Sequence, residues 1–141
     1  MTETTPVRPR WAAVAALVAV AFGILTIIVG GKTLFSGPVE RAAGGNIVPF
    51  VLWFNFLAGF AYVIAGLGLF LWKRWAAALS AAIAMATVFV FVALGVHILL
   101  GGAFETRTIA AMTIRSLVWI VIAVRACRGV ECFPRGLGRP A

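Results

Sequence analysis

Three polar side chains interrupt long apolar runs of this chain, and their types are suited to chemistry. Asn55, His97 and Arg115 carry an amide, an imidazole and a guanidinium. An imidazole can shuttle protons near neutral pH or bind a metal ion, and a guanidinium binds the oxygens of carboxylates and carbonyls. Because a polar group inside a bilayer costs free energy unless it is satisfied, each of the three is a candidate for function.

Four apolar segments must position these side chains. At about 1.5 Å rise per residue, roughly 20 residues cross a hydrocarbon core of about 30 Å as a helix. The segments cover residues 11–31, 47–72, 75–101 and 108–126. They lack the alternation of apolar and polar residues that a membrane β-barrel requires. We predict an all-α integral membrane protein, an antiparallel four-helix bundle, with a transmembrane domain over 1–128 and a basic cytoplasmic tail over 129–141.

The composition favours the same class. Of the 141 residues, 63% are hydrophobic and 11% are charged, and the mean hydropathy is +1.09. A soluble domain carries about 25% charged residues, so a soluble fold is disfavoured. The net charge is +8, but the cations stand at the ends of apolar segments and form no stripe along one face. We therefore expect a lipid bilayer, and no nucleic acid, as the partner of this charge.

The distribution of cations predicts an orientation, because cytoplasmic loops carry an excess of Lys and Arg. With both termini inside, the inner side holds Arg8, Arg10, Lys73, Arg74, Arg125, Arg128, Arg135 and Arg139. The outer side then holds Lys32, Arg41 and Arg107. We predict a multi-pass protein of a bacterial-type inner membrane with both termini in the cytoplasm. In the outer loop, Pro38 to Ala43 is expected to form a short surface helix, with Ser36 as its cap.

Small residues at helical spacing predict the faces that point inward, because membrane helices associate by close packing of small side chains. The first segment has Ala12, Ala16, Ala19, Gly23, Thr26 and Gly30 in such a stripe. The second has Asn55, Ala58, Ala61, Ala65 and Gly68, and the third has Ala82, Ala86, Val90, Ala93 and His97. Asn55 and His97 are therefore expected to face the interior of the bundle.

We predict a polar ligand-binding pocket near the outer face, because the embedded polar residues all fall in the outer third of their segments. The candidate ligand-binding residues are Arg115, His97, Asn55, Glu105, Arg107 and Lys32. Two structural alternatives stay open. Arg115 can pair with Glu105 or with loop carbonyls, and His97 can bond to a backbone carbonyl or to Asn55.

Other chemistry is disfavoured by the residues at hand. A haem with two axial histidines is excluded, because the chain has one histidine. A zinc site needs three or four ligands. Cys127 and Cys132 are expected in the cytoplasm, where thiols stay reduced, which argues against a redox disulfide. No catalytic residue is predicted.

The first segment ends in Gly30, Gly31 and Lys32, the second ends in the run Ala65 to Leu69, and a basic turn and an Ala-rich third segment follow. With these features the chain resembles small bacterial four-helix membrane proteins of the DoxX-like type. This resemblance implies an accessory subunit of a membrane oxidoreductase, with a quinone-linked or thiol-linked role.

Several functions remain open at this point. The first is a non-catalytic subunit or binding protein for a small anionic or quinone-like ligand. The second is a small oligomeric transporter or exporter, disfavoured as a proton-coupled one because no Asp or Glu lies within a span. The third is an enzyme with His97 as acid or base, and the fourth is a scaffold. A homo-oligomer or a larger membrane complex is the expected setting.

Overall fold

The computed structural model describes residues 7–130, and within that range the chain is built from helices and short connections. The helices are α1 (Arg10–Phe35), α2 (Pro38–Ala43), α3 (Pro49–Phe70), α4 (Arg74–Leu99) and α5 (Thr106–Val130). The four long ones, α1, α3, α4 and α5, are each long and apolar enough to cross a membrane. The predicted all-α fold with four potential spans is therefore confirmed. The predicted ends are too early in two places, because α1 continues past residue 31 and α5 past residue 126.

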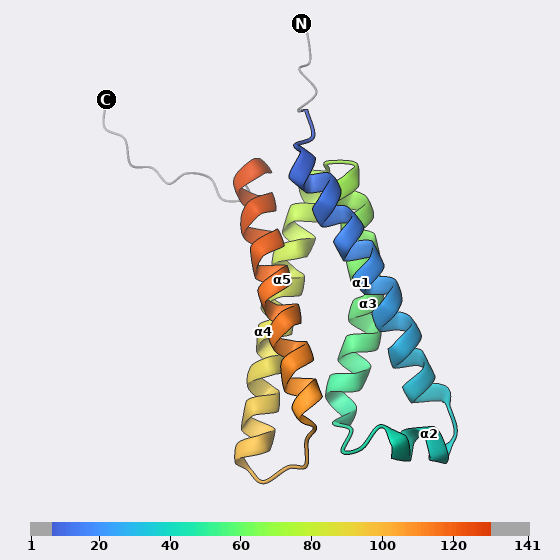
Figure 1. Cartoon of the computed structure of the whole chain (residues 1–141). Coiled ribbons are helices and arrows are strands. Elements are labelled where there is room, and N and C mark those ends of the chain that lie inside the picture. Colours follow the sequence, from blue (N-terminus) through green and yellow to red (C-terminus); the bar gives the residue numbers. More distant parts are fainter. Residues whose placement is uncertain (1–6, 131–141) are drawn as a thin grey trace, which may run out of the picture.

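Consecutive long helices run in opposite directions, as Figure 1 shows. The start of α1, the turn between α3 and α4, and the end of α5 gather at one end of the bundle, which we name the basic end after Arg10, Lys73 and Arg128. The opposite end, named the loop end, carries α2 and the connection between α4 and α5. The two ends of the described chain thus lie on the same side of the bundle.

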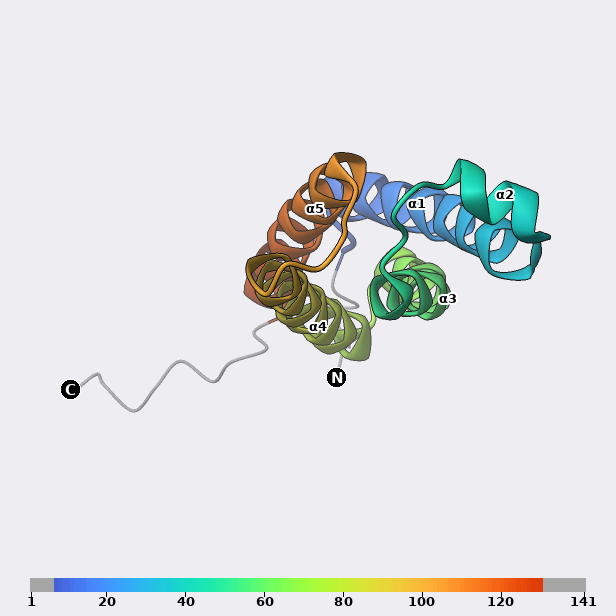
Figure 2. The ribbon, with the colours of Figure 1, turned by 90° about the horizontal axis from the view of Figure 1, so that it is seen from below.

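The helices pack with unequal closeness. α1 packs along α3, and α4 packs on both α5 and α3, whereas α1 and α5 make few close approaches. Seen along the bundle in Figure 2, α1 and α5 lie apart at the loop end. The seam between α1 and α5 is therefore the loosest junction between neighbouring helices that enclose the core.

Small residues allow the close packing of α1 on α3. All six positions of the predicted stripe in α1 are buried, which confirms that face. A Cβ atom built on Gly23 would lie 2.7 Å from the backbone oxygen of Gly59, so the two backbones meet directly there. Close contact between small residues is the usual way in which strongly apolar helices associate.

The predicted inward face of α4 is only partly right, because Val90, Ala93 and His97 are half-buried. Ala82 and Ala86 are exposed, and the buried face turns instead through Ala76, Ala77, Ser80, Ile83, Ala84, Thr87 and Leu94. Alanine occupies most of the first half of α4, so small size does not single out one face. In α3 the prediction is partly right, because Ala65 and Gly68 are buried while Asn55, Ala58 and Ala61 are half-buried.

A tight turn joins α3 to α4 at the basic end. Trp72 adopts a left-handed backbone with φ of 52°, and the Lys73 N–H donates back to the Gly68 oxygen at 2.9 Å. This is the hydrogen-bond pattern of a Schellman motif, with a tryptophan where glycine is usual. The Trp72 ring packs edge-on against Trp11, with 5.5 Å between ring centroids, so the turn is also fastened to α1.

The short helix α2 has the predicted bounds. Its N-cap residue is Gly37 and no side chain caps it, so the prediction of Ser36 as the cap is wrong. At the other terminus, α5 includes the first two residues of the predicted tail, and residues 131–141, with Cys132, Arg135 and Arg139, lie outside the described range.

Candidate functional site

Arg115 extends from α5 into the middle of the bundle and is only 7% exposed. One terminal nitrogen, Nη2, donates to the Thr26 hydroxyl of α1 at 3.3 Å, and Nη1 lies 3.7 Å from the Met112 sulfur. Both partners are neutral. Within residues 7–130 the structure gives Arg115 no carboxylate partner, so the internal pair with Glu105 does not form.

Aromatic rings cover the guanidinium in place of an acid. Its central carbon lies 5.3 Å from the centroid of Phe22 and 5.9 Å from that of Tyr62. The Tyr62 ring in turn packs at 4.7 Å on Trp119. A cation over a ring face is worth about 0.5 to 2 kcal/mol, most when both are shielded from water. The rings therefore offset part of the cost of burying the charge.

Several polar atoms around Arg115 are buried without a hydrogen-bond partner among the described residues. They are Arg115 Nε, the Ser116 hydroxyl, Trp119 Nε1, and the hydroxyls of Tyr62 and Thr87, which lie close to each other. Together with Thr26 these residues form what we name the buried polar cluster, with members on α1, α3, α4 and α5. Buried polar groups are nearly always hydrogen-bonded, and leaving one unsatisfied costs about 1 to 3 kcal/mol. Such a group of unsatisfied atoms is therefore a candidate site.

The chemistry of the buried polar cluster is that of oxygen recognition. The guanidinium has five N–H donors and no acceptor, and its two hydrogen-bond partners are a hydroxyl and a thioether sulfur. The hydroxyls of Tyr62 and Thr26 can donate or accept beside it. A carbonyl or carboxylate oxygen on an apolar molecule would satisfy several of these donors at once. No set of three His, Cys, Asp or Glu able to hold a metal ion occurs in the part of the chain that the structure describes.

His97 lies apart from Arg115, near the end of α4. Its Nε2 is 3.2 Å from the Ala103 oxygen, and its ring meets Phe50 edge-on at 6.0 Å. A Cβ on Gly102 would lie only 2.2 Å from Nε2, so the imidazole covers the backbone that follows the helix. The structural alternative that the sequence left open for His97, a bond to a backbone carbonyl, matches this geometry.

Glu105 and Arg107 hold the loop end together. Glu105 Oε1 accepts a hydrogen bond from the Asn46 N–H at 2.8 Å, and Arg107 donates to the Gly44 oxygen. Gly45, between the two, has φ of 74°, and a Cβ there would overlap the Glu105 carboxylate. These contacts fasten the start of α5 to the segment before α3, and neither residue touches Arg115.

The remaining predicted residues are more isolated. Asn55 is half-buried on α3, and its Oδ1 has no hydrogen-bond partner among residues 7–130. Lys32 is exposed in the last turn of α1. The structure therefore divides the six predicted residues among the bundle interior, the end of α4 and the loop end, and does not gather them in one pocket.

Sequence reasoning missed Tyr62, Thr87, Ser116 and Trp119. Only charged, imidazole and amide side chains within the spans were candidates. These four residues carry hydroxyl and indole groups, which are common in apolar helices and therefore do not stand out. Tyr62 carried a usable signal, because it is the single tyrosine of the chain and stands mid-span, away from the interfacial position where tyrosine is enriched.

Cys127 packs at the edge of the main core near the end of α5. It is disulfide-bonded in the structure, so the expectation of a reduced thiol at this residue is not met. Cys132 lies outside the described residues.

Comparisons of the chain with protein-family models, with curated proteins and with solved structures found no match, and the buried polar cluster is therefore interpreted from its own geometry.

Proposed function

We propose that this chain is a non-catalytic multi-pass membrane protein that binds a small apolar ligand through a carbonyl or carboxylate oxygen at Arg115. The observation that carries the proposal is a guanidinium buried at mid-bundle whose two hydrogen-bond partners are neutral. An intramembrane charge is costly and is retained where it has a use.

Several features support ligand binding over catalysis. The cluster offers donors and hydroxyls, but the described residues place no carboxylate or histidine beside Arg115 to act as a base. General acid and base catalysis requires such a group within hydrogen-bond reach of the reacting proton. Rings of Phe22, Tyr62 and Trp119 provide flat apolar surfaces, which suit a planar or hydrocarbon ligand body.

The loose seam between α1 and α5 is the proposed route of entry. Arg115 reaches across it to Thr26, while α1 and α5 pack far less closely than α1 and α3. A ligand from the bilayer would displace the long Arg115–Thr26 bond at small cost and bring a stronger acceptor. A quinone fits this description. The DoxX-like resemblance implies the same kind of ligand, and an accessory role in a membrane oxidoreductase is therefore part of the proposal.

Ligand-dependent thermal stabilisation of the purified full chain tests the proposal. The probes are a short-tailed benzoquinone and a medium-chain carboxylate, each titrated against the protein in a neutral detergent. A hydrogen bond to a charged group is worth about 1.5 to 3 kcal/mol, so we expect Arg115→Leu to weaken binding about tenfold to a hundredfold. Tyr62→Phe, which removes one hydroxyl and keeps the ring, is expected to weaken it less.

The matched control is Arg128→Gln, which removes an exposed cation from the same helix, outside the cluster and outside the groove between α1 and α5. It should leave the midpoint of the titration unchanged. The proposal fails if neither probe stabilises the native chain, or if Arg115→Leu and Arg128→Gln weaken binding to the same extent.

A further inference from the structure

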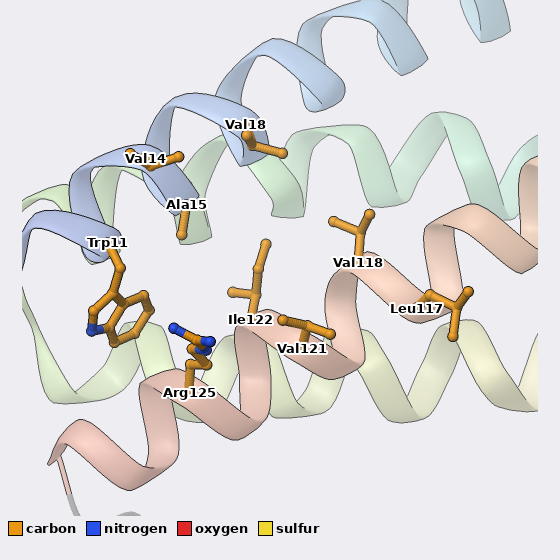
Figure 3. A pocket seen from close by; sticks show the side chains of 9 residues that line it. All are labelled: Trp11, Val14, Ala15, Val18, Leu117, Val118, Val121, Ile122 and Arg125. Atoms are coloured by element: carbon orange, nitrogen blue, oxygen red, sulfur yellow. The ribbon is translucent and has the colours of Figure 1, made fainter.

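A groove runs along the seam between α1 and α5, from mid-bundle to the basic end. Its volume is about 500 Å³, and Val14 and Val18 of α1 face Val118 and Ile122 of α5 across it. Figure 3 shows these side chains on both walls, with Trp11 and Arg125 at the same end of the groove. The lining of α5 from Leu117 to Arg125 extends roughly 12 Å at 1.5 Å per residue.

The groove is apolar except at the end that holds Arg125. This guanidinium is exposed at the basic end, and Arg10 and Arg128 are exposed cations at the same end. Within residues 7–130 both carboxylates, Glu40 and Glu105, lie at the loop end. The groove therefore combines a hydrocarbon channel with positive charge at one end, and no carboxylate of residues 7–130 lies at that end.

We propose that an anionic phospholipid occupies this groove, with one acyl chain between α1 and α5 and its phosphate beside Arg125 and Trp11. Basic groups near a membrane surface attract anionic headgroups, and a tryptophan ring is suited to the headgroup level. A free anion would gain nothing from the valine walls. A second copy of the chain would bring its own cations to the same place and meet like charge.

The lipid site is separate from the buried polar cluster. Arg125 is exposed at the basic end, whereas Arg115 is buried at mid-bundle. Lipid in the groove would fill the part of the seam where the helices themselves pack loosely, and would act there as the missing contact between α1 and α5.

Native mass spectrometry of the full chain, released from bilayers that contain equal amounts of phosphatidylglycerol and neutral phosphatidylcholine, tests this proposal. We expect one phosphatidylglycerol retained in preference to phosphatidylcholine. Arg125→Gln should weaken that preference about fivefold, the contribution of one basic group near the surface. Arg74→Gln, which removes another exposed cation at the basic end but does not line the groove, should leave it unchanged.

A second pair of variants tests the hydrocarbon channel. Val18→Phe fills the groove and should abolish the retained lipid. Val124→Phe is its control, because Val124 is 45% exposed, close to the 43% of Val18, and does not line the groove. The proposal is overturned if Arg125→Gln and Arg74→Gln act alike, or if inorganic phosphate displaces the lipid. It is also overturned if Val18→Phe leaves lipid retention intact. If Val18→Phe then dissociates a dimer instead, the groove is an interface between two copies of the chain.

Discussion

Arg115 places a guanidinium in the apolar middle of the bundle, where its contacts are a hydroxyl, a sulfur and two aromatic rings. His97, which looks equally promising in the sequence, instead covers the backbone at the end of α4. The difference between the two residues lies in their surroundings. His97 lies next to a loop and contacts a free backbone carbonyl, that of Ala103. Arg115 lies at mid-bundle, where helical carbonyls are already bonded, and contacts side chains of neighbouring helices.

Replacement of Arg115 by methionine is predicted to leave the native fold as stable as before or to stabilise it. The substitution removes a buried charge that has no carboxylate partner among residues 7–130, so it removes a desolvation cost and leaves no partner charge unpaired. The measurement is the free energy of unfolding in detergent without added ligand. A large loss of stability in Arg115→Met would instead make Arg115 a structural residue and remove the main support for a ligand.

The pairing of α1 with α3 rests on direct backbone contact at Gly23 and Gly59, while the junction of α1 with α5 is loose. Helix α1 is therefore packed closely against α3 and loosely against α5. Both proposed sites lie along that seam, because loosely packed helices leave room for a ligand or a lipid.

Substitution of Gly23 by alanine is predicted to destabilise the bundle by about 1 to 3 kcal/mol, the usual cost of an overpacked contact. The new Cβ would lie 2.7 Å from the Gly59 oxygen, which is backbone and cannot rotate away. Unfolding in a denaturing detergent provides the measurement.

Gly95→Ala is the matched control, since Gly95 also lies within a long helix but has nothing within 4 Å of an added Cβ. It should be neutral, or stabilising by up to about 1 kcal/mol through better helix propensity. Equal effects of the two substitutions would show that the close approach of α1 and α3 does not limit stability.

The molecule as a whole is polarised by its charges. Exposed cations crowd the basic end, and the two described carboxylates lie at the loop end. The described chain enters and leaves the bundle at the basic end, as an even number of long helices requires.

Topology reporters should place the basic end in the cytoplasm, following the distribution of Lys and Arg. A green fluorescent protein fused after Lys73 is predicted to fluoresce, and alkaline phosphatase fused after Gly37 is predicted to be active. The reversed pair of fusions supplies the control and should be silent. Activity of phosphatase after Lys73 would invert the orientation and move the proposed lipid site to the outer leaflet.

The sequence by itself determined the four long helices, the bounds of α2 and the buried face of α1. Each depends on local length, hydropathy or residue size, which can be read without knowing the partner of a helix. It also identified Arg115 as an embedded charge. The inward face of the first half of α4 was predicted wrongly, because small alanine side chains occur all around that part of the helix.

Only the tertiary structure decided which polar residues meet. The tilt and rotation of the helices relative to one another decide whether Glu105 contacts Arg115 or Asn46. They also decide whether His97 lines a pocket or contacts the backbone at the end of α4. Those angles follow from packing between segments distant in the chain, such as Gly23 against Gly59. The buried polar cluster arises in this way, because it joins Thr26, Tyr62, Thr87 and Arg115 from four helices whose spacing in the sequence gives no hint of contact.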